Sequence, residues 1–393
     1  MLTDRSGGRM AEQHHEDWDP RSAEVQKDQI RAYDAMRKEC PVAWSDYQQW
    51  TLFRHADVMR ALEDHHTFSN AVSAHLSVPN GMDPPEHTPY RKAIEPYFAP
   101  EPMARFEPVC RDVARALVQT LDKNKPLDVV NALSRPFALQ IQCAFMGWPD
   151  SLHQPLAEWV MKNHRATLAR DHAAMADVAE EFDGYIRDLL DSRRQPNKPA
   201  PDDVTTRLMR EQINGQPMTD AELVSLLRNW TVGELATISA SISILTNYLA
   251  HHHELLNNLK AAPEQLPEAI DEILRMDAPL ISNRRVTTRE VEIGGRTIPA
   301  SEKITLLWAS ANRDEVVFGN PDQFCPRQNA ARNLLYGAGI HVCPGAPLAR
   351  MELRIFMEEL LKQIEAIEQA DGEQPERAMF PTGGFNYLPL VFR

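Results

Sequence analysis

The chain has 393 residues, with 42 lysine and arginine residues against 56 aspartate and glutamate residues, a formal net charge of −14. A negative charge of this size argues against nucleic acids and anionic membranes as partners. No apolar run reaches the roughly 18 residues that a membrane span needs, and no signal-peptide pattern opens the chain. The sequence therefore predicts a cytoplasmic protein that binds neither nucleic acid nor membrane.

Most of the chain has helical periodicity, and strand-like segments are few. Residues 1–20 are polar and charged, which predicts a disordered leader. Strands are expected at Ala43–Phe53, Val291–Ile298 and Lys303–Trp308 and in a C-terminal hairpin near Tyr387, and a loop is expected at Ser192–Pro201. The five cysteines are an odd number without CxxC spacing, so they fit reduced thiols rather than a disulfide framework.

Two pairs of charged or titratable residues have helical spacing. His87 and Arg91 are four residues apart after the stiff entry Asp83–Glu86, so they share one helix face and can hold one anionic group. Glu272 and Arg275 are three residues apart and can form an ion pair on their helix. Alone, neither pattern is specific, because residues that form ordinary surface ion pairs occur on many exposed helices.

The longest predicted helix begins at Thr219–Glu222, which has the pattern of a capping box. Apolar and small residues then lie on nearly all sides of this helix through Leu245, which predicts a buried central helix. Within the helix, Glu234 and Thr237 are three residues apart and therefore lie near one face.

The most informative segment is Tyr336–Arg350, YGAGIHVCPGAPLAR. Two glycines allow a tight turn against a large flat ligand, and Cys343 follows at the end of the turn. Gly345 opens a helix whose N-terminal amides face the sulfur and favour thiolate over thiol. A rigidly held thiolate suits a soft metal, with haem iron as the leading case. The alternative is a buried structural cysteine beside a turn.

This segment resembles the haem-binding loop of the cytochrome P-450 family, F-G-x-G-x-H-x-C-x-G-x-x-L-A-R, with Tyr336 in place of phenylalanine. The resemblance implies a mainly α fold, with one large helical domain over residues 21–393 and a small β-rich part around a buried haem b (iron protoporphyrin IX). It also implies a monooxygenase that uses dioxygen, with Cys343 as the metal ligand. The electron donor would be a ferredoxin or a flavin and iron–sulfur reductase.

The same resemblance assigns roles to individual residues. The residues implied to bind the cofactor are His87, Arg91, Arg285, Tyr336, Gly337, His341, Cys343 and Gly345, with Arg284 as the competing choice for one propionate contact. The candidate catalytic residues are Gly233, Glu234 and Thr237. Glu272 and Arg275 match the structural E-x-x-R motif, and Arg327 is the expected third member of that network.

The central helix departs from the family's G-x-[D/E]-T pattern, because Leu235 and Ala236 occupy the expected acid and alcohol positions. In one interpretation Glu234 and Thr237 replace that pair, and a buried glutamate relays protons. In a second, proton delivery is water-mediated and the enzyme uses hydrogen peroxide readily, as a peroxygenase. In a third, Glu234 forms a salt bridge away from the haem, and Thr237 bonds back to a helix carbonyl.

The substrate is expected to be a small, apolar organic molecule such as an aromatic ether, oxidised by hydroxylation or O-dealkylation. This expectation rests on the apolar candidates for the pocket wall, which by resemblance are Val72, Leu76, Leu235, Ile281 and Phe385. The sequences of Phe68–Met82 and Arg228–Thr237 resemble a bacterial subgroup that includes reductase-fused haem domains and stand-alone relatives. No CxxxxCxxC cluster motif follows the haem domain, so a separate or removed reductase is expected to supply electrons. The alternative from another class is a non-catalytic haem sensor.

Overall fold

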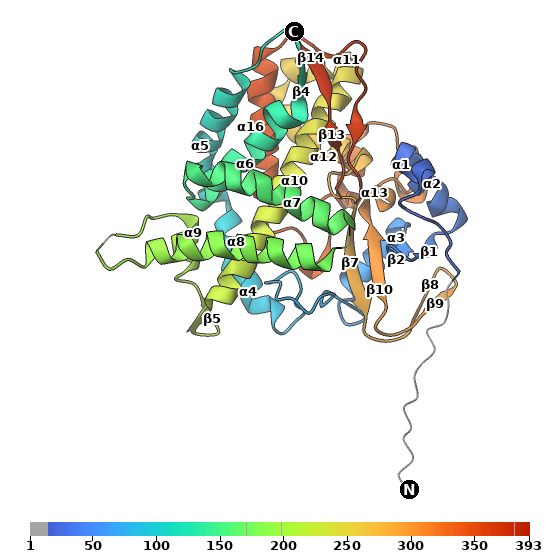
Figure 1. Ribbon diagram of the computed structural model, residues 1–393. Coiled ribbons are helices and arrows are strands. Elements are labelled where there is room, and N and C mark those ends of the chain that lie inside the picture. The colour runs from blue at the N-terminus through green and yellow to red at the C-terminus, as the bar shows by residue number, and fades with distance from the viewer. Residues whose placement is uncertain (1–14, 170, 198, 381) are drawn as a thin grey trace.

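The computed structural model describes residues 15–169, 171–197, 199–380 and 382–393. Long helices form the larger body, and the main sheet lies at its side next to the N-terminal helices (Figure 1). This architecture confirms the mainly helical fold with small sheets that the sequence predicts. Within the described ranges, no helix combines the length and the apolar character needed to cross a bilayer.

The helices include both long elements and single turns. The longer helices are α2 (Gln29–Glu39), α3 (His55–Glu63), α4 (His87–Ile94), α5 (Pro100–Val118), α6 (Arg135–Met146), α7 (His153–Ala169), α8 (His172–Arg193), α10 (Asp220–His251), α11 (His253–Ala261), α12 (Leu266–Met276) and α16 (Ala346–Gln363). The short α-helices are α1 (Ala23–Lys27), α9 (Val204–Leu208), α13 (Trp308–Ala311), α14 (Glu315–Phe318) and α15 (Pro326–Asn329). The remaining turns are η1 (Glu95–Phe98), η2 (Val130–Ser134), η3 (Asp150–Leu152), η4 (Pro263–Gln265), η5 (Ala330–Arg332) and η6 (Gly339–His341).

The strands are short. They are β1 (Val42–Ser45), β2 (Gln49–Leu52), β3 (Phe68–Ser69), β4 (Pro126–Asp128), β5 (Gln212–Ile213), β6 (Gln216–Pro217), β7 (Ser282–Thr287), β8 (Val291–Ile293), β9 (Arg296–Ile298), β10 (Lys303–Leu307), β11 (Ile367–Gln369), β12 (Glu376–Arg377), β13 (Phe385–Tyr387) and β14 (Pro389–Phe392).

Helix α10 runs through the middle of the helical body (Figure 1). Its predicted capping box is present: the Thr219 hydroxyl accepts from the Glu222 amide at 3.3 Å, and the Glu222 carboxylate accepts from the Thr219 amide at 2.6 Å. Leu226, Ile242 and Leu245 are buried on different faces of the helix. Helices α6, α8, α12 and α16 pack around α10, so the prediction of a buried central helix is confirmed.

The main sheet has the strand order β1-β2-β10-β7-β3. The predicted strand region at residues 43–53 is the antiparallel hairpin β1–β2, and the region at 291–298 is the hairpin β8–β9. Strand β10 pairs in parallel with β2 and antiparallel with β7, where Ile304 is the partner of Arg285. This pairing fixes the position of Arg285 in β7.

The C-terminal strands differ from the predicted hairpin. Strand β13 pairs with β12, while β14 pairs with β11 and β4, so the two strands near Tyr387 belong to different sheets. The reason is that the hydrogen-bonding edges of β14 are taken by segments distant in the chain. The Val129 amide, which follows β4, extends this contact by donating to the Leu388 carbonyl at 2.9 Å.

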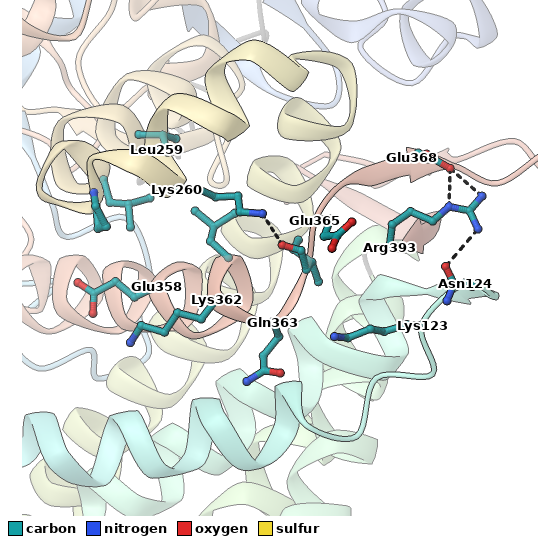
Figure 2. A pocket seen from close by; sticks show the side chains of 14 residues that line it. Lys123, Asn124, Leu259, Lys260, Glu358, Lys362, Gln363, Glu365, Glu368 and Arg393 are labelled. Carbon is teal, nitrogen blue, oxygen red and sulfur yellow. Dashed lines mark hydrogen bonds and ion pairs between the residues drawn. The ribbon is translucent and has the colours of Figure 1, made fainter.

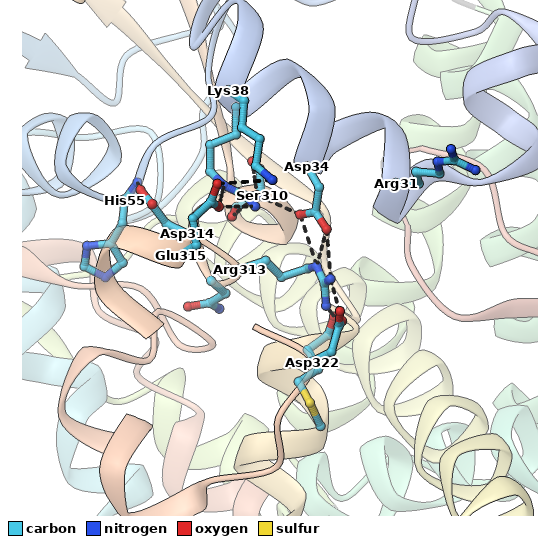
Figure 3. A network of polar contacts seen from close by, with 12 residues as sticks. Arg31, Asp34, Lys38, His55, Ser310, Arg313, Asp314, Glu315 and Asp322 are labelled. Carbon is cyan, nitrogen blue, oxygen red and sulfur yellow. Dashed lines mark hydrogen bonds and ion pairs between the residues drawn. The ribbon is translucent and has the colours of Figure 1, made fainter. Parts of the chain in front are cut away.

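Buried ion pairs fasten α2 to the segment that follows β10 (Figure 3). Arg313 is 4% exposed, and its Nη2 lies 2.8 Å from Asp34 and 2.7 Å from Asp322. Arg37 of α2 pairs with Glu315 of α14 at 2.8 Å. Because each guanidinium has several partners, the network joins distant segments rather than forming an isolated surface pair.

The N-terminal stretch that the structure describes is packed against the sheet. Trp18 is 8% exposed and its ring lies edge-on to that of Phe53, while the Asp17 amide donates to the Trp44 carbonyl at 2.9 Å. Residues 15–20 of the predicted leader are therefore part of the packed structure. The rest of that leader lies outside the described residues.

A groove of about 1080 Å³ lies between α11, α16 and the C-terminal strand (Figure 2). Its charged side chains mostly join chain segments: Lys260 donates to the Ile364 carbonyl at 2.6 Å, and Arg393 pairs with Glu368 at 2.8 Å. The described residues that line the groove include no cysteine, serine, threonine or histidine, so the candidate site lies elsewhere.

Candidate functional site

The turn from Tyr336 to Gly345 presents Cys343 to an internal cavity. The Cys343 amide donates to the Tyr336 carbonyl at 2.8 Å, which closes the turn. Gly337 and Gly339 have φ values of 74° and 70°, a region that favours glycine. A Cβ on Gly339 would lie 2.3 Å from the backbone oxygen of Leu62 in α3. The predicted glycine turn is present, and both its positive φ and the close approach of α3 require glycine at position 339.

Cys343 has a free thiol that is exposed to the cavity. Protein atoms surround the sulfur on its other sides, and this burial raises the pKa of the Cys343 thiol. The amides of Gly345 and Ala346, at the start of α16, act in the opposite direction and lower that pKa. The predicted contact between helix amides and sulfur therefore exists, although burial has the larger effect on the pKa of the thiol. Binding of a metal cation would reverse this balance in favour of thiolate.

Tyr336, which replaces the family's phenylalanine, lies between the cysteine turn and α16. The guanidinium of Arg350 lies 4.4 Å from the centroid of the Tyr336 ring, and Arg350 also pairs with Asp271 of α12 at 2.9 Å. Tyr336 is thereby held at the cavity wall by a charged residue of the helix that follows Cys343.

The cavity has a volume of about 350 Å³ and lies between the cysteine turn and α10. Its wall includes most of the predicted site residues, namely Gly233, Glu234, Thr237, Arg285, Tyr336, Gly337, His341, Cys343 and Gly345. His87 and Arg91 lie behind this wall. The sequence elements that bring the set together are α10, β7 and the turn before α16.

Two histidines meet at the cavity, the buried His87 and the half-buried His341. The ring centroids of His87, in α4, and His341, in the cysteine turn, are 4.3 Å apart. Both Nε2 atoms are buried and have no hydrogen-bond partner among the described residues. Burial lowers the pKa of both rings, that of His341 to about 3, so both are neutral at pH 7. Two such N–H donors fit an anionic ligand group such as a haem propionate.

Arg285 is a buried cation that faces the cavity from β7. It is 3% exposed, and its Nη1 donates to the Arg284 carbonyl at 2.7 Å. Burial lowers the pKa of Arg285 to about 10, and no carboxylate among the described residues forms an ion pair with it. An uncompensated buried guanidinium also fits a propionate. Arg284, the competing choice, is not part of the cavity wall.

Arg91 lies on the outer side of the cysteine turn. Its Nη1 donates to the Val342 carbonyl at 2.6 Å, and its Nε donates to Glu95 at 2.8 Å. Arg91 therefore joins α4 to the residue before Cys343. It shares the α4 face with His87, as the four-residue spacing predicts.

The α10 residues at the cavity bear on all three interpretations of this helix. A Cβ on Gly233 would meet nothing within 4 Å, so the wall is open there. The Thr237 hydroxyl donates to the Gly233 carbonyl at 2.6 Å, as the third interpretation expects. Glu234 contradicts that interpretation, because it lines the cavity and forms no salt bridge with any residue that the structure describes.

The predicted substrate-facing residues are not where the sequence placed them. The cavity wall contains none of Val72, Leu76, Leu235, Ile281 and Phe385. Leu235 instead faces a hollow between α6 and α7. The helix period explains the error: the α10 residues in the wall are Asn229, Trp230, Gly233, Glu234, Thr237, Ile238 and Ser241, which share one face. Position 235 lies outside that face, and the spacing of these residues along the sequence already indicates this.

The E-x-x-R pair is buried in α12, against the segments that contain Asn312 and Asn329. Arg275 is 0% exposed and donates to Glu272 from Nε at 2.8 Å. The third member of the network differs from the prediction. Asn329 donates to Glu272 at 2.7 Å, whereas the Arg327 side chain is 83% exposed and pairs with Glu268. The chain path through α15 turns position 329 inward and position 327 outward.

Comparison with known proteins agrees with this geometry. A model of the family "Cytochrome P450" matches residues 150–388. The chain is 30% identical over 375 residues to linalool 8-monooxygenase from Pseudomonas putida, covering 88% of this chain and 92% of the relative. It is 31% identical over 372 residues to erythromycin C-12 hydroxylase from Saccharopolyspora erythraea, covering 91% and 92%.

Solved structures show the same fold. A mutant of P450 EryK in complex with erythromycin B superposes with a TM-score of 0.85 at 27% identity, covering 93% of this chain and 96% of that one. The family model matches more than half of the chain, and the relatives are matched over most of their length. This chain belongs to the cytochrome P450 family and is a monooxygenase.

Proposed function

We propose that this monooxygenase uses a haem b held by Cys343 to oxidise a small, largely apolar substrate such as an aromatic ether. The observation that carries the proposal is the shared cavity: a free thiol lines one side, and the open stretch of α10 at Gly233 lines the other. When bound, the haem supplies the redox chemistry that activates dioxygen.

The chain's own residues fit this cofactor. Cys343 supplies the thiolate ligand, and Tyr336, Gly337 and Gly345 flank it at the cavity wall. The propionates would be held by the unpaired Nε2 groups and guanidinium described above, namely His87, His341 and Arg285, with Arg91 supporting the cysteine turn. These donors would offset the cost of burying two carboxylates.

On the opposite wall, α10 offers space and a proton. Gly233 leaves room for a small ligand, because a Cβ there would meet no atom within 4 Å beyond its own stretch of helix. Burial raises the pKa of Glu234 to about 7, so this carboxyl exchanges its proton near neutral pH. Thr237 can donate its hydroxyl either to Gly233, as here, or to a ligand in the cavity. This favours the acid–alcohol interpretation of the departure from the family pattern.

The wall supports an apolar, aromatic-compatible substrate. Phe98, Phe145 and Trp230 line the cavity and contact one another, with centroid distances of 4.9 Å for Phe98–Trp230 and 5.9 Å for Phe98–Phe145. The amides of Gln142 and Asn229 also lie in the wall, but they donate to Thr231 and Ser77 within the protein. Shape and burial would therefore dominate recognition. The relatives are named for linalool, erythromycin and cyclomarin C, so their names do not select one substrate class.

We propose that electrons come from a separate ferredoxin or from a flavin and iron–sulfur reductase. Hydrogen peroxide is the alternative oxidant, since the chain lacks the usual acid and alcohol at positions 235 and 236. The two routes are separated by comparing product formed with peroxide alone and with a reductase and NADH. Comparable rates would favour the peroxygenase alternative.

Two spectra test the proposal. The ferrous carbon monoxide spectrum should show thiolate ligation in the wild-type protein and lose it in Cys343→Ala; an unchanged spectrum in the variant would refute the assignment of Cys343. Titration of the ferric protein with small methoxyarenes should then give a saturable shift from low to high spin. Without a shift across the panel, the aromatic-ether class would be rejected while the haem-thiolate assignment remained.

A further inference from the structure

Residues 71–82 form a strap between β3 and α4, beside the cavity. The two ends of the strap are joined through Asp83, whose carboxylate accepts from the Asn70 amide at 3.1 Å. The first half of the strap is at the surface, where Leu76 is 42% exposed. In the second half, Asn80 lines the cavity. The strap therefore leads from the surface of the protein into the cavity wall.

Helix α10 holds the middle of the strap through two polar side chains. The Ser225 hydroxyl accepts from the Val78 amide at 2.9 Å and donates to the Leu76 carbonyl at 2.9 Å. The side-chain amide of Asn229 donates to the Val78 carbonyl at 3.0 Å and to the Ser77 hydroxyl at 3.1 Å. This part of the strap belongs to none of the described strands. The two side chains therefore bind backbone groups that a neighbouring strand would otherwise bind.

Ser225 uses its hydroxyl differently from the serines and threonines further along α10. Five of those hydroxyl groups donate to a carbonyl of the same helix, namely Thr231, Thr237, Ser241, Ser243 and Thr246. This back-bonding is common for serine and threonine inside helices. Ser225 is 1% exposed, and its single proton goes to the Leu76 carbonyl of the strap instead. The hydrogen-bonding capacity of this buried serine is therefore committed to the strap.

The residues that hold the strap belong to the same row of α10 as the residues at its open stretch. Ser225, Asn229, Gly233 and Thr237 follow one another at intervals of four, so each is a neighbour of the next along the helix surface. Asn229, Gly233 and Thr237 line the cavity, whereas Ser225 does not. The strap is therefore attached at one end of the row that bounds the cavity, and its position limits the cavity at that end.

We propose that Ser225 and Asn229 are positioning residues, which hold the strap against α10 and thereby set the largest substrate that the cavity accepts. The inference rests on the monooxygenase function proposed above. Loss of either side chain lets residues 76–80 move away from α10 and widens the cavity at Asn80. The strap contains no aspartate, glutamate, lysine or arginine, so the wall that it forms suits an uncharged ligand.

Hydrogen exchange of the full-length ferric protein, followed by mass spectrometry of peptides that cover residues 71–82, tests the attachment without turnover. In Ser225→Ala the Val78 amide loses its acceptor, and exchange in the strap should become about 2- to 10-fold faster, the factor that one hydrogen bond typically contributes. The matched control is Ser243→Ala. Ser243 is also 1% exposed on α10, but its hydroxyl donates to the Ala240 carbonyl, so this variant should leave exchange in the strap unchanged.

The size limit is measured with imidazole and 4-phenylimidazole, two haem ligands of different size, by absorbance titration of the ferric protein. In Ser225→Ala the affinity for 4-phenylimidazole relative to imidazole should rise by about 2- to 10-fold, because a hydrogen bond no longer opposes displacement of the strap by the larger ligand. Ser225 does not line the cavity, so its own side chain adds no space there. A purely structural role would weaken both affinities equally, and Ser243→Ala should keep the wild-type ratio.

The inference is overturned if exchange in the strap, or the ratio of the two affinities, is the same in Ser225→Ala as in the wild-type protein. If circular dichroism shows that Ser225→Ala does not fold, Asn229→Ala takes its place, because it removes the bonds to Ser77 and Val78. Those outcomes leave the proposed function intact as long as the wild-type carbon monoxide spectrum shows thiolate ligation. A wild-type protein without that spectrum would instead refute the proposed function, and the exchange experiment does not depend on it.

Discussion

Removal of the Arg275 side chain should destabilise the protein more than any surface substitution nearby. Arg275 is 0% exposed and donates to Glu272 at 2.8 and 3.0 Å, to the Asn312 carbonyl at 2.7 Å and to the Pro321 carbonyl at 3.1 Å. In Arg275→Ala these acceptors lose their donor, and Glu272 keeps a buried negative charge. Breaking such a buried pair typically costs about 3–5 kcal/mol.

Urea unfolding followed by far-UV circular dichroism measures this loss. With a slope of about 3 kcal/mol per M, the midpoint should fall by at least about 1 M. The matched control is Arg327→Ala, because Arg327 is 83% exposed in its pair with Glu268 and should contribute about 0–1 kcal/mol. Replacing Glu272 and Arg275 together should cost less than the sum of the single variants. A midpoint as low in the Arg327 variant as in the Arg275 variant would refute the assignment of Asn329, rather than Arg327, to this network.

Three further substitutions test the site. Gly339→Ala should disrupt folding, because its Cβ would lie 2.3 Å from a backbone oxygen. In Gly337→Ala the nearest atom to the new Cβ is 3.9 Å away, so only left-handed backbone strain of about 1–2 kcal/mol is expected. Thermal unfolding of both variants measures the difference. Arg285→Leu should speed haem loss to apomyoglobin by about 10- to 100-fold, since a charge-assisted hydrogen bond contributes about 1.5–3 kcal/mol. Arg285→Lys keeps a positive charge and should lose haem at an intermediate rate. Equal rates in the wild-type protein and both variants would exclude a propionate contact. Burial raises the pKa of Glu234 from 4.5 to about 7. Between these pH values the folded state therefore binds more protons than the unfolded state. The free energy of unfolding should fall as the pH rises through this window. Glu234→Gln should weaken this dependence in urea titrations at several pH values, because burial also raises the pKa of Glu352, which remains. An unaltered dependence would assign it to other groups.

The features that could be predicted from the sequence are those whose geometry is local. The turn from Tyr336 to Gly345 is contiguous, so the spacing of its glycines and cysteine specifies its shape. The capping box at Thr219 and the pair Glu272–Arg275 lie within single helical turns, where residues three apart are neighbours whatever the rest of the protein does.

The errors involve residues whose surroundings depend on several elements. Leu235 was placed in the cavity wall, but the rotation of α10 against α6 and α7 turns it to the other side. Arg327 was expected beside Glu272, but the path of the chain through α15 places Asn329 there. Neither rotation nor path is encoded in a short pattern, because both result from packing of the whole core.

The sequence alone therefore determined the family, the turn that presents Cys343 and the helical character of the chain, since each depends on neighbours along the backbone. Only the tertiary structure brought the neutral rings of His87 and His341 together and placed Asn329 against Glu272. These contacts join residues far apart in the chain, so helix packing, not sequence spacing, decides which side chains meet.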